Sequence, residues 1–353
     1  MWHAVLFLAP VTTVGTVVLG MSLGGWWSFL TVGWLFVGLA VIDQTVGLDL
    51  SDPPAQTARD RTFFRLAVWA WVPVQFSLLA WAFWVVDTWT LSLVEWAGLI
   101  GAVGSITGAG GITVAHELMH RKSRFERALA ELLMATCSYT HFCIEHVHGH
   151  HRRVGTRDDP ATAWLGETFY SFWVRSVFGG VASAWHLEAA RLKRRGKAVF
   201  GPSNRMLRYA AELVLIYAVL WALFGWKGVG FFAAQGIFGF TLLEIINYLE
   251  HYGLTRREVA PGRFEPVKPH HSWNTSRRIT NMYLINLGRH SDHHHQPGRR
   301  YQDLRHIADA PQLPMGYPAM VGLALVPLLW HWLMDPRVEE WRRTYQSDEP
   351  VAA

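Results

Sequence analysis

Six long apolar runs limit the folds that this chain can adopt. A helix needs about 20 predominantly apolar residues to cross the hydrocarbon core of a bilayer. The runs come close to that length, at residues 4–20, 26–42, 66–86, 91–115, 206–224 and 228–250. They predict an all-α, polytopic membrane protein whose six transmembrane helices form three hairpins. Because no basic segment precedes the first run, we expect a membrane helix there rather than a signal peptide.

Basic residues are distributed unevenly between the two ends of the predicted spans. The short connections at 21–25, 87–90 and 225–227 hold only Lys227 among the 32 lysines and arginines. Since basic residues near span ends stay on the cytoplasmic side, we expect both termini to be cytoplasmic. The same rule places a histidine-rich cap, residues 116–205 and 251–353, in the cytoplasm, within a single integral membrane domain spanning 1–353.

Composition excludes some partners. The net charge of +5 and the absence of any nucleic-acid-binding motif favour anionic membrane lipids or an acidic protein over nucleic acid. Cys137 and Cys143 lie on the predicted cytoplasmic side, where we expect them to be reduced and buried.

Several segments of the cap have readable patterns. Residues 168–195 have the pattern of a helix, and 254–280 that of an irregular loop. The apolar stretch 315–334 is interrupted by Pro318 and Pro327, which predicts a re-entrant or interfacial segment.

Histidines cluster at helical spacing in three places. Residues three or four apart share a helix face, so each cluster is expected to aim its imidazoles at one point. A further histidine follows the last apolar run, in Asn247-Tyr248-Leu249-Glu250-His251-Tyr252-Gly253. The predicted metal ligands are His116, His120, His146, His150, His151, His251, His290, His293 and His294.

Nine imidazoles exceed the needs of one metal ion. A divalent first-row ion takes four to six ligands, and neutral imidazole suits Zn, Cu, Fe and Ni, so the set predicts a dinuclear site. Two such ions would attract carboxylates, which orient imidazoles through their second ring nitrogen. The residues expected in this supporting role are Glu117, Glu145, Glu244, Asn247, Glu250 and Asp292. His148 and His295 are expected to lie outside the ligand set.

Three other interpretations compete with a dinuclear site. His116-Glu117-Leu118-Met119-His120 matches the zinc metalloprotease pattern H-E-x-x-H, but an intramembrane protease leaves seven of the nine histidines unused. Incidental histidines are hard to reconcile with three separate clusters at helical spacing. A transporter with a metal-sensing face would be expected to have paired broken helices, which the sequence lacks.

The order H-x-x-x-H, E-H-x-x-x-H-H and H-x-x-H-H resembles the membrane-bound alkane 1-monooxygenases of the fatty acid desaturase and hydroxylase superfamily. The three boxes alone are also compatible with an acyl desaturase or an aryl-methyl hydroxylase. Residues 247–253 and 287–294 are the segments that look specific to the alkane branch. The segment His271-Ser272-Trp273-Asn274 also resembles one near the site in that family, which implies a supporting role for His271 and no direct metal contact. The resemblance implies two non-haem Fe ions, O2 as co-substrate and terminal hydroxylation of an n-alkane to a 1-alkanol in a bacterial inner membrane.

The resemblance also implies that electrons come from rubredoxin, itself reduced by a rubredoxin reductase. This sequence has no C-x-x-C pair for a rubredoxin iron, so the donor must be a separate protein or a domain outside this sequence. Rubredoxins as a family are acidic, and arginines near the boxes suit docking of such a partner. These are Arg152, Arg153, Arg157, Arg256, Arg257, Arg299 and Arg300. The alkane is expected to enter from lipid into a pocket of Trp, Phe, Leu and Ile side chains.

Overall fold

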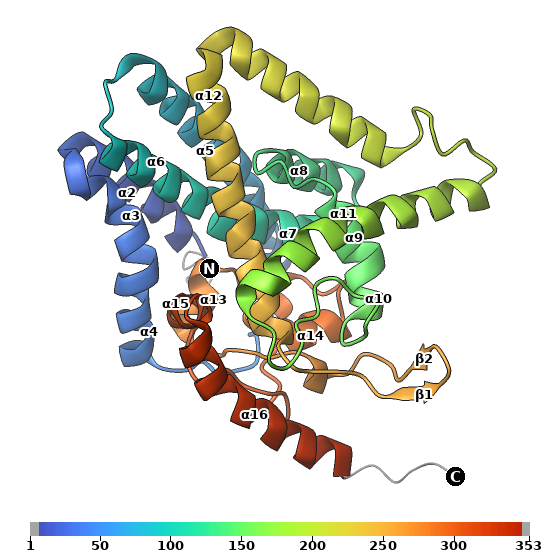
Figure 1. The fold of residues 1–353 in the computed structure, drawn as a ribbon. Helices are drawn as coiled ribbons and strands as arrows, with labels where there is room; N and C mark the ends of the chain where they lie inside the picture. The colour runs from blue at the N-terminus through green and yellow to red at the C-terminus, as the bar shows by residue number, and fades with distance from the viewer. Residues whose placement is uncertain (1–6, 348–353) are drawn as a thin grey trace.

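A computed structural model of the chain describes residues 7–347, and it is predominantly helical (Figure 1). Four helices are long and apolar enough to cross a membrane, at Gly25–Val46, Ala58–Thr88, Leu93–Met119 and Arg205–His251. A bent pair, Tyr317–Ala324 and Pro327–Tyr345, makes a fifth if it counts as one span. The first helix, α2 (Ala9–Leu23), is apolar but only 15 residues long, and the beginning of the predicted run 4–20 lies outside the described residues.

The membrane-spanning part is built from continuous helices that change type along their length. The elements are η1 (Gly25–Phe29), α3 (Leu30–Gly33), η2 (Trp34–Gly38), α4 (Leu39–Val46), α5 (Ala58–Thr88), α6 (Leu93–Ser105), η3 (Ile106–Ile112), α7 (Thr113–Met119) and α12 (Arg205–His251). Capping boxes at Thr57/Asp60 and Ser92/Glu95 start α5 and α6, because side-chain oxygens satisfy the first free N–H groups. Glu95 also accepts the N–H of Gly25 at 2.9 Å, which ties the second hairpin to the first.

Helix α12 is divided at Gly225. This residue has φ 60° and ψ −157°, a conformation open to glycine but costly for other residues. The two halves run as a V with its point at Gly225 (Figure 1). They correspond to the predicted runs 206–224 and 228–250.

Glycines let α6 and η3 pack closely against their neighbours, as small residues do between membrane helices. A Cβ atom on Gly108 would lie 2.7 Å from the carbonyl oxygen of Gly239 on α12. One on Gly110 would lie 2.0 Å from the Trp71 ring on α5. The histidine-bearing end of α7 is therefore held at a fixed distance from α5 and α12.

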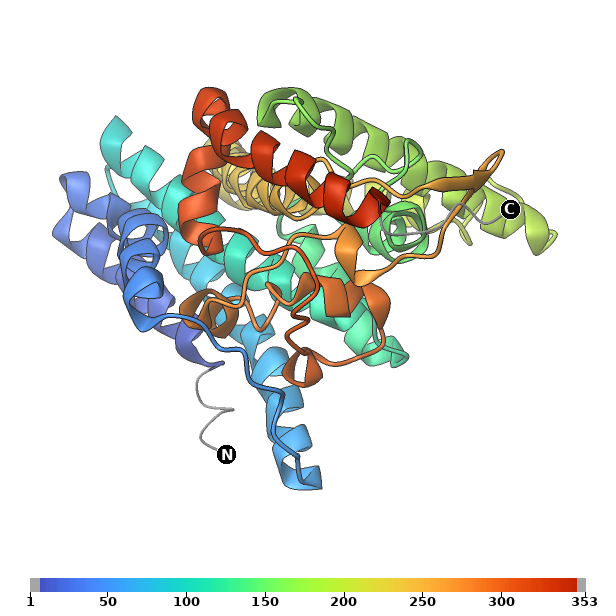
Figure 2. The same ribbon diagram turned by 90° about the horizontal axis from the view of Figure 1, so that it is seen from below.

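The remaining elements belong to residues 116–205 and 251–353, the region called the cap. They are α8 (Arg124–Ala135), α9 (Phe142–Glu145), η4 (His146–His150), α10 (His151–Arg153), α11 (Phe169–Arg194), β1 (Glu258–Ala260), β2 (Arg263–Phe264), η5 (Pro269–His271), α13 (Arg278–Tyr283), α14 (His290–His295), η6 (Tyr301–Asp303), α15 (Tyr317–Ala324) and α16 (Pro327–Ser347). Helices α15 and α16 lie in front of α12 in Figure 2. The predicted helix 168–195 is α11. The predicted loop 254–280 contains the antiparallel pair β1–β2 and two short helical turns.

The stretch 315–334 contains the expected break, at one proline instead of two. The chain bends by 117° between α15 and α16, and α16 starts at Pro327. Pro318 does not interrupt a helix, because it lies in the first turn of α15, where no N–H donor is needed. Cys137 and Cys143 are free and buried, as predicted.

Candidate metal centre

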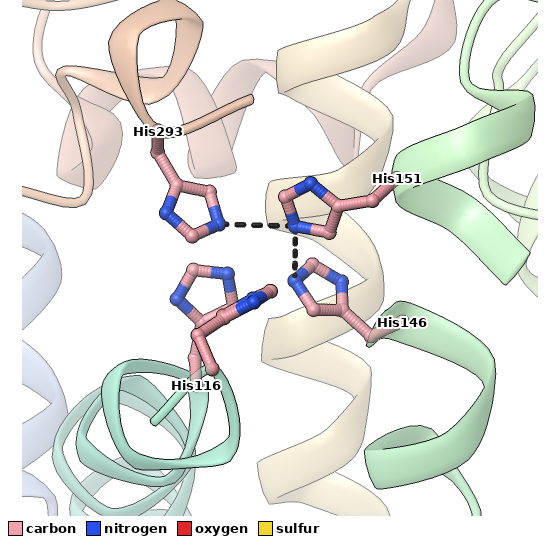
Figure 3. Close-up of side chains that lie close together, drawn as sticks. His116, His146, His151 and His293 are labelled. Carbon is pink, nitrogen blue, oxygen red and sulfur yellow. Dashed lines mark hydrogen bonds between the residues drawn. The ribbon is translucent and has the colours of Figure 1, made fainter. Parts of the chain in front are cut away.

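The nine histidines predicted as ligands gather in two adjacent groups. The first contains His116, His120, His146, His151 and His293, and the second contains His150, His251, His290 and His294. Within each group, one nitrogen from every ring lies within 4.8 Å of all the others. Seven of the nine are buried, and His120 and His151 are partly exposed. In the first group, the rings from α7, the η4–α10 segment and α14 point toward one another (Figure 3).

A π-helical turn divides the second histidine box between the two groups. In η4 the backbone hydrogen bonds connect residues five apart, so His146 and His151 lie nearly one above the other. Their Nε2 atoms are 3.0 Å apart. His150 turns toward the second group. The expectation that 146, 150 and 151 share one point is therefore wrong, because it assumed α-helical geometry.

The third box is divided in the same way, although α14 is an ordinary α-helix. His290 and His294, four residues apart, share a face and enter the second group. His293 enters the first group, with its Nε2 atom 3.1 Å from that of His151. Helix α14 thus lies between the two groups and supplies ligands to both.

The nitrogens at each centre fit a metal ion. Those of His290 and His251 face each other with Nε2 atoms 3.2 Å apart. The Nε2 atoms of His116, His120, His150 and His294 are buried with no hydrogen-bond partner among the described residues. Such atoms are costly to bury, and a cation at each centre would satisfy them. The donor set suits a first-row transition metal, since every potential ligand is an imidazole.

Burial keeps these imidazoles in the neutral form that binds metals. Burial first, and the neighbouring imidazoles second, hold the pKa values of His146, His151 and His293 well below 6.5. The same causes lower the pKa values of His290 and His294. For His150 burial also acts to lower the pKa, but the Asp159 carboxylate outweighs it and raises that pKa.

Two carboxylates contact ligand rings on the side away from the centre. Asp159 Oδ2 lies 2.9 Å from His150 Nδ1 and also accepts the Thr162 hydroxyl. Glu250 Oε1 lies 3.1 Å from His290 Nδ1. This arrangement leaves Nε2 of each ring for a metal ion. Glu250 was among the predicted residues, whereas Asp159 was not; the signal available was the Asp158-Asp159-Pro160 run close to the second box.

The other predicted supporting residues bind different partners. A residue next to a ligand on a helix points to another face, so these side chains meet the surroundings of the site. The contacts are Glu117 with Arg121, Glu145 with Arg153 and Ser183, Asp292 with Arg299, Glu244 with the Tyr139 hydroxyl, and His271 with Glu265. Asn247 lines the cavity described below.

Three further histidines lie outside the two groups, and one of them, His271, is not in its predicted supporting position. His148 and His295 are exposed. His271 belongs to a separate group with Glu265 and His270. The ammonium group of Lys268 already lies 3.4 Å from the Glu265 carboxylate, so this carboxylate has a cation as neighbour without a metal ion.

Four of the seven arginines predicted to dock an electron donor are engaged inside the cap. They are Arg153 with Glu145, Arg256 with the carbonyl of Arg152, Arg299 with Asp292, and Arg300 with Glu126. The other three, Arg152, Arg157 and Arg257, have exposed side chains. The arginines therefore do not form one uniform free surface, because internal carboxylates bind part of the set.

A narrow apolar cavity of about 90 Å³ reaches the two histidine groups. Its wall includes His116 and His146 of the first group and His290 of the second. The rest comes mainly from apolar side chains of the long helices and of α13 and α15, among them Phe36, Leu39, Trp71, Ile106 and Leu242. A hydrocarbon in this cavity would meet rings of both groups and, elsewhere, mainly apolar side chains.

Long apolar helices and two groups of buried imidazoles at one end define a class, the membrane enzymes with histidine boxes. In agreement, a model of the fatty acid desaturase family matches residues 93–324.

Relatives of known function narrow this class. The chain is 39% identical to alkane 1-monooxygenase 2 of Pseudomonas aeruginosa over 351 residues, 94% of this chain and 91% of that protein. It is 39% identical to the alkane 1-monooxygenase of Ectopseudomonas oleovorans over 330 residues, 90% of this chain and 82% of that protein. The hydroxylase component of a xylene/toluene monooxygenase of Pseudomonas putida is 30% identical over 348 residues, 97% of this chain and 90% of that protein. The chain belongs to the alkane 1-monooxygenases of the fatty acid desaturase family.

Proposed function

We propose that this protein hydroxylates the terminal methyl group of n-alkanes, with O2 as co-substrate and rubredoxin as electron donor. The observation that supports this most directly is the apolar cavity ending on His116, His146 and His290, rings of both histidine groups. Two Fe ions held by the nine imidazoles would supply the activation of O2 that an unactivated C–H bond requires.

The side chains of the chain itself supply binding and orientation. The cavity wall binds the hydrocarbon by apolar contact, limits the access of water and orients the chain toward the imidazoles that line it. Asp159 lies within hydrogen-bond distance of Nδ1 of His150, and Glu250 Oε1 lies 3.1 Å from Nδ1 of His290, so both carboxylates face the ring nitrogen on the side away from the centre.

The proposed topology has six spans, with both halves of α12 crossing the bilayer and α2 completing the first hairpin. The break at Gly225 supports this count, because it converts one 47-residue helix into two segments of spanning length. Basic residues then place the cap and both termini in the cytoplasm, and the membrane is the bacterial inner membrane.

Reduced rubredoxin is proposed to dock on the cytoplasmic face of the cap, and a rubredoxin reductase returns it to the reduced state. The exposed side chains of Arg152 and Arg157 belong to the part of the predicted arginine set that faces solvent and could meet an acidic partner.

The function is tested with protein purified in detergent. Metal analysis should give two Fe per chain, and incubation with n-alkanes, reduced rubredoxin and isotopically labelled O2 should give 1-alkanols that contain the label. One Zn per chain without labelled alkanol would reject the proposal and favour a protease at the H-E-x-x-H segment.

Similarity to the xylene/toluene monooxygenase component supports a second candidate, hydroxylation of an aryl methyl group. Competition assays that offer an n-alkane and toluene together separate the two. We expect the alkanol to dominate, and preferential formation of benzyl alcohol would favour the aryl-methyl alternative.

A further inference from the structure

A tyrosine of α15 connects the cavity wall to a ring of the second histidine group. The hydroxyl of Tyr317 donates to Glu250 Oε1 at 2.6 Å, and the same oxygen lies 3.1 Å from His290 Nδ1. All three side chains are buried, with 1% of Tyr317, 1% of Glu250 and 2% of His290 exposed. Tyr317 also lines the cavity that reaches His290.

The hydroxyl limits where the carboxylate can lie. A buried carboxylate needs donors to offset its loss of water, and an O–H donor at about 2.5–2.7 Å from a charged oxygen is among the stronger hydrogen bonds. Tyr317 therefore fixes Oε1 of Glu250 at the place where it meets the imidazole. Without the hydroxyl, the carboxylate loses this constraint, and its position beside the imidazole is no longer fixed.

The backbone around Tyr317 is itself held in place. A Cβ atom on Gly316 would lie 1.8 Å from Asp43 Oδ2, so only glycine permits this approach. Asp43 accepts the N–H groups of Ile279 and Thr280, each at 3.1 Å. The start of α15 thus packs closely against the end of α4, and Asp43 connects α4 to the start of α13.

Helix α16 holds the residues that follow Glu250 (Figures 1 and 2). The Tyr252 hydroxyl donates to Asp335 at 2.6 Å, and the Arg342 guanidinium donates to the Gly253 carbonyl at 2.6 Å. The segment that contains His251 is therefore attached at both ends to the α15–α16 pair.

We propose that Tyr317 is a positioning residue for the second histidine group, acting through Glu250 on His290. The proposal rests on the proposed function in one respect, that this group binds one of two metal ions. In this proposal the α15–α16 pair has a role in the site: Tyr317 lines the substrate cavity and also orients the metal ligand His290 through Glu250.

The test uses full-length, metal-free protein titrated with Co²⁺, with binding followed by visible absorption in competition with a chelator. Tyr317→Phe keeps the ring in the cavity wall and removes only the hydroxyl. It should weaken the binding of one of the two ions about tenfold, the lower end of the effect for partners of metal ligands, and change the absorption band of that ion alone. With metal loaded, kcat should fall while KM for the alkane stays the same.

Tyr248→Phe is the matched control. Like Tyr317, Tyr248 is buried, but it lies on α12. Its hydroxyl donates to the main-chain oxygen of Glu167 at 2.7 Å. It should leave both Co²⁺ affinities unchanged. Equal losses in the two variants would reduce Tyr317 to a general structural role and overturn the proposal.

A double variant tests the route through Glu250. Tyr317→Phe combined with Glu250→Gln should bind Co²⁺ no more weakly than Glu250→Gln alone, whereas additive losses contradict the route. Failure of the proposed function would be seen separately, because the unaltered protein would then bind fewer than two ions. Even then, unchanged affinity of the remaining ion in Tyr317→Phe would reject the role of Tyr317.

Discussion

The Nε2 atoms of His146 and His151 lie 3.0 Å apart, although the two residues are five positions apart along a helical segment. An α-helix points such residues in different directions, and the π-helical turn η4 removes that difference. His150 is thereby free to join His251 and His290 in the second group. One local change in helix type thus creates two neighbouring centres from a single histidine box.

The effect of replacing a histidine should depend on whether its ring belongs to one of the two groups, and not on how close the residue is to a ligand in sequence. His151→Ala should lower the iron content and the activity together, because it removes one ligand of the first group. His148→Ala, in the same turn but exposed, should keep both. Metal analysis and alkanol yield measure the outcome, and equal loss of iron in the two variants would contradict the assignment.

Asp159 should affect metal binding although it was not among the predicted site residues. Asp159→Asn weakens the acceptor at His150 Nδ1, so we expect metal affinity to fall about 10- to 100-fold. Asp158→Asn changes the exposed neighbour and should leave affinity unchanged. Chelator competition on both variants provides the comparison, and an unaffected Asp159→Asn protein would exclude an orienting role.

Topology is testable by thiol labelling, because Cys137 and Cys143 are buried. In inside-out vesicles, an impermeant thiol reagent should modify Arg263→Cys, at an exposed position of the 254–268 loop. Lys227→Cys should react only in right-side-out vesicles, since it lies beyond the break at Gly225. Exchange of the two patterns would place the histidine groups on the outer side of the membrane.

Docking of the electron donor should depend on the exposed arginines. Arg152→Glu with Arg157→Glu should raise KM for reduced rubredoxin and leave the iron content intact. Arg194 is also exposed, at the end of α11, and Arg194→Glu is the control. It changes the net charge by the same amount as Arg152→Glu or Arg157→Glu alone. High salt should also weaken donor saturation, as the Debye length falls from about 10 Å at 0.1 M to about 3 Å at 1 M. Donor kinetics unaffected by both changes would place docking elsewhere.

Arg299 and Arg300 are unsuitable for that test, because charge reversal there would leave the carboxylates of Asp292 and Glu126 without their partners. We expect those variants to lose stability as well as activity. Thermal unfolding in detergent distinguishes this from a docking defect.

Glu188 should contribute stability that depends on pH. Burial acts to raise its pKa, but hydrogen bonds from Arg191 and Arg205 outweigh this and lower the pKa to about 2. A lowered carboxylate pKa stabilises the folded state above the unfolded value, 4.5, and this contribution disappears as pH falls toward about 2. Glu188→Gln should therefore destabilise the protein at pH 7 by about 1–3 kcal/mol. Thermal unfolding should show a smaller difference from the unaltered protein below pH 4, and a pH-independent difference would contradict this account.

The apolar runs and the histidine boxes could be predicted from the sequence because both depend on local patterns. A long run without charges has few alternatives to a buried or membrane helix, and histidines at helical spacing indicate a cluster of rings on one short segment. The helix covering 168–195 and the break before Pro327 follow from equally local features. The nine imidazoles that gather in the two groups could therefore be predicted from the sequence as one set.

Tertiary structure decided which ring belongs to which group and what orients it. The division of the boxes depends on the π-helical turn at His146–His150 and on the place of α14 between the groups. Asp159 and His150, which are in contact, lie 9 positions apart in the sequence, and Tyr317 and Glu250 lie 67 positions apart. Most predicted carboxylates instead bind arginines, because neighbours in sequence point to different helix faces. Spacing specifies direction around one helix, whereas partners across helices follow only from how those helices pack.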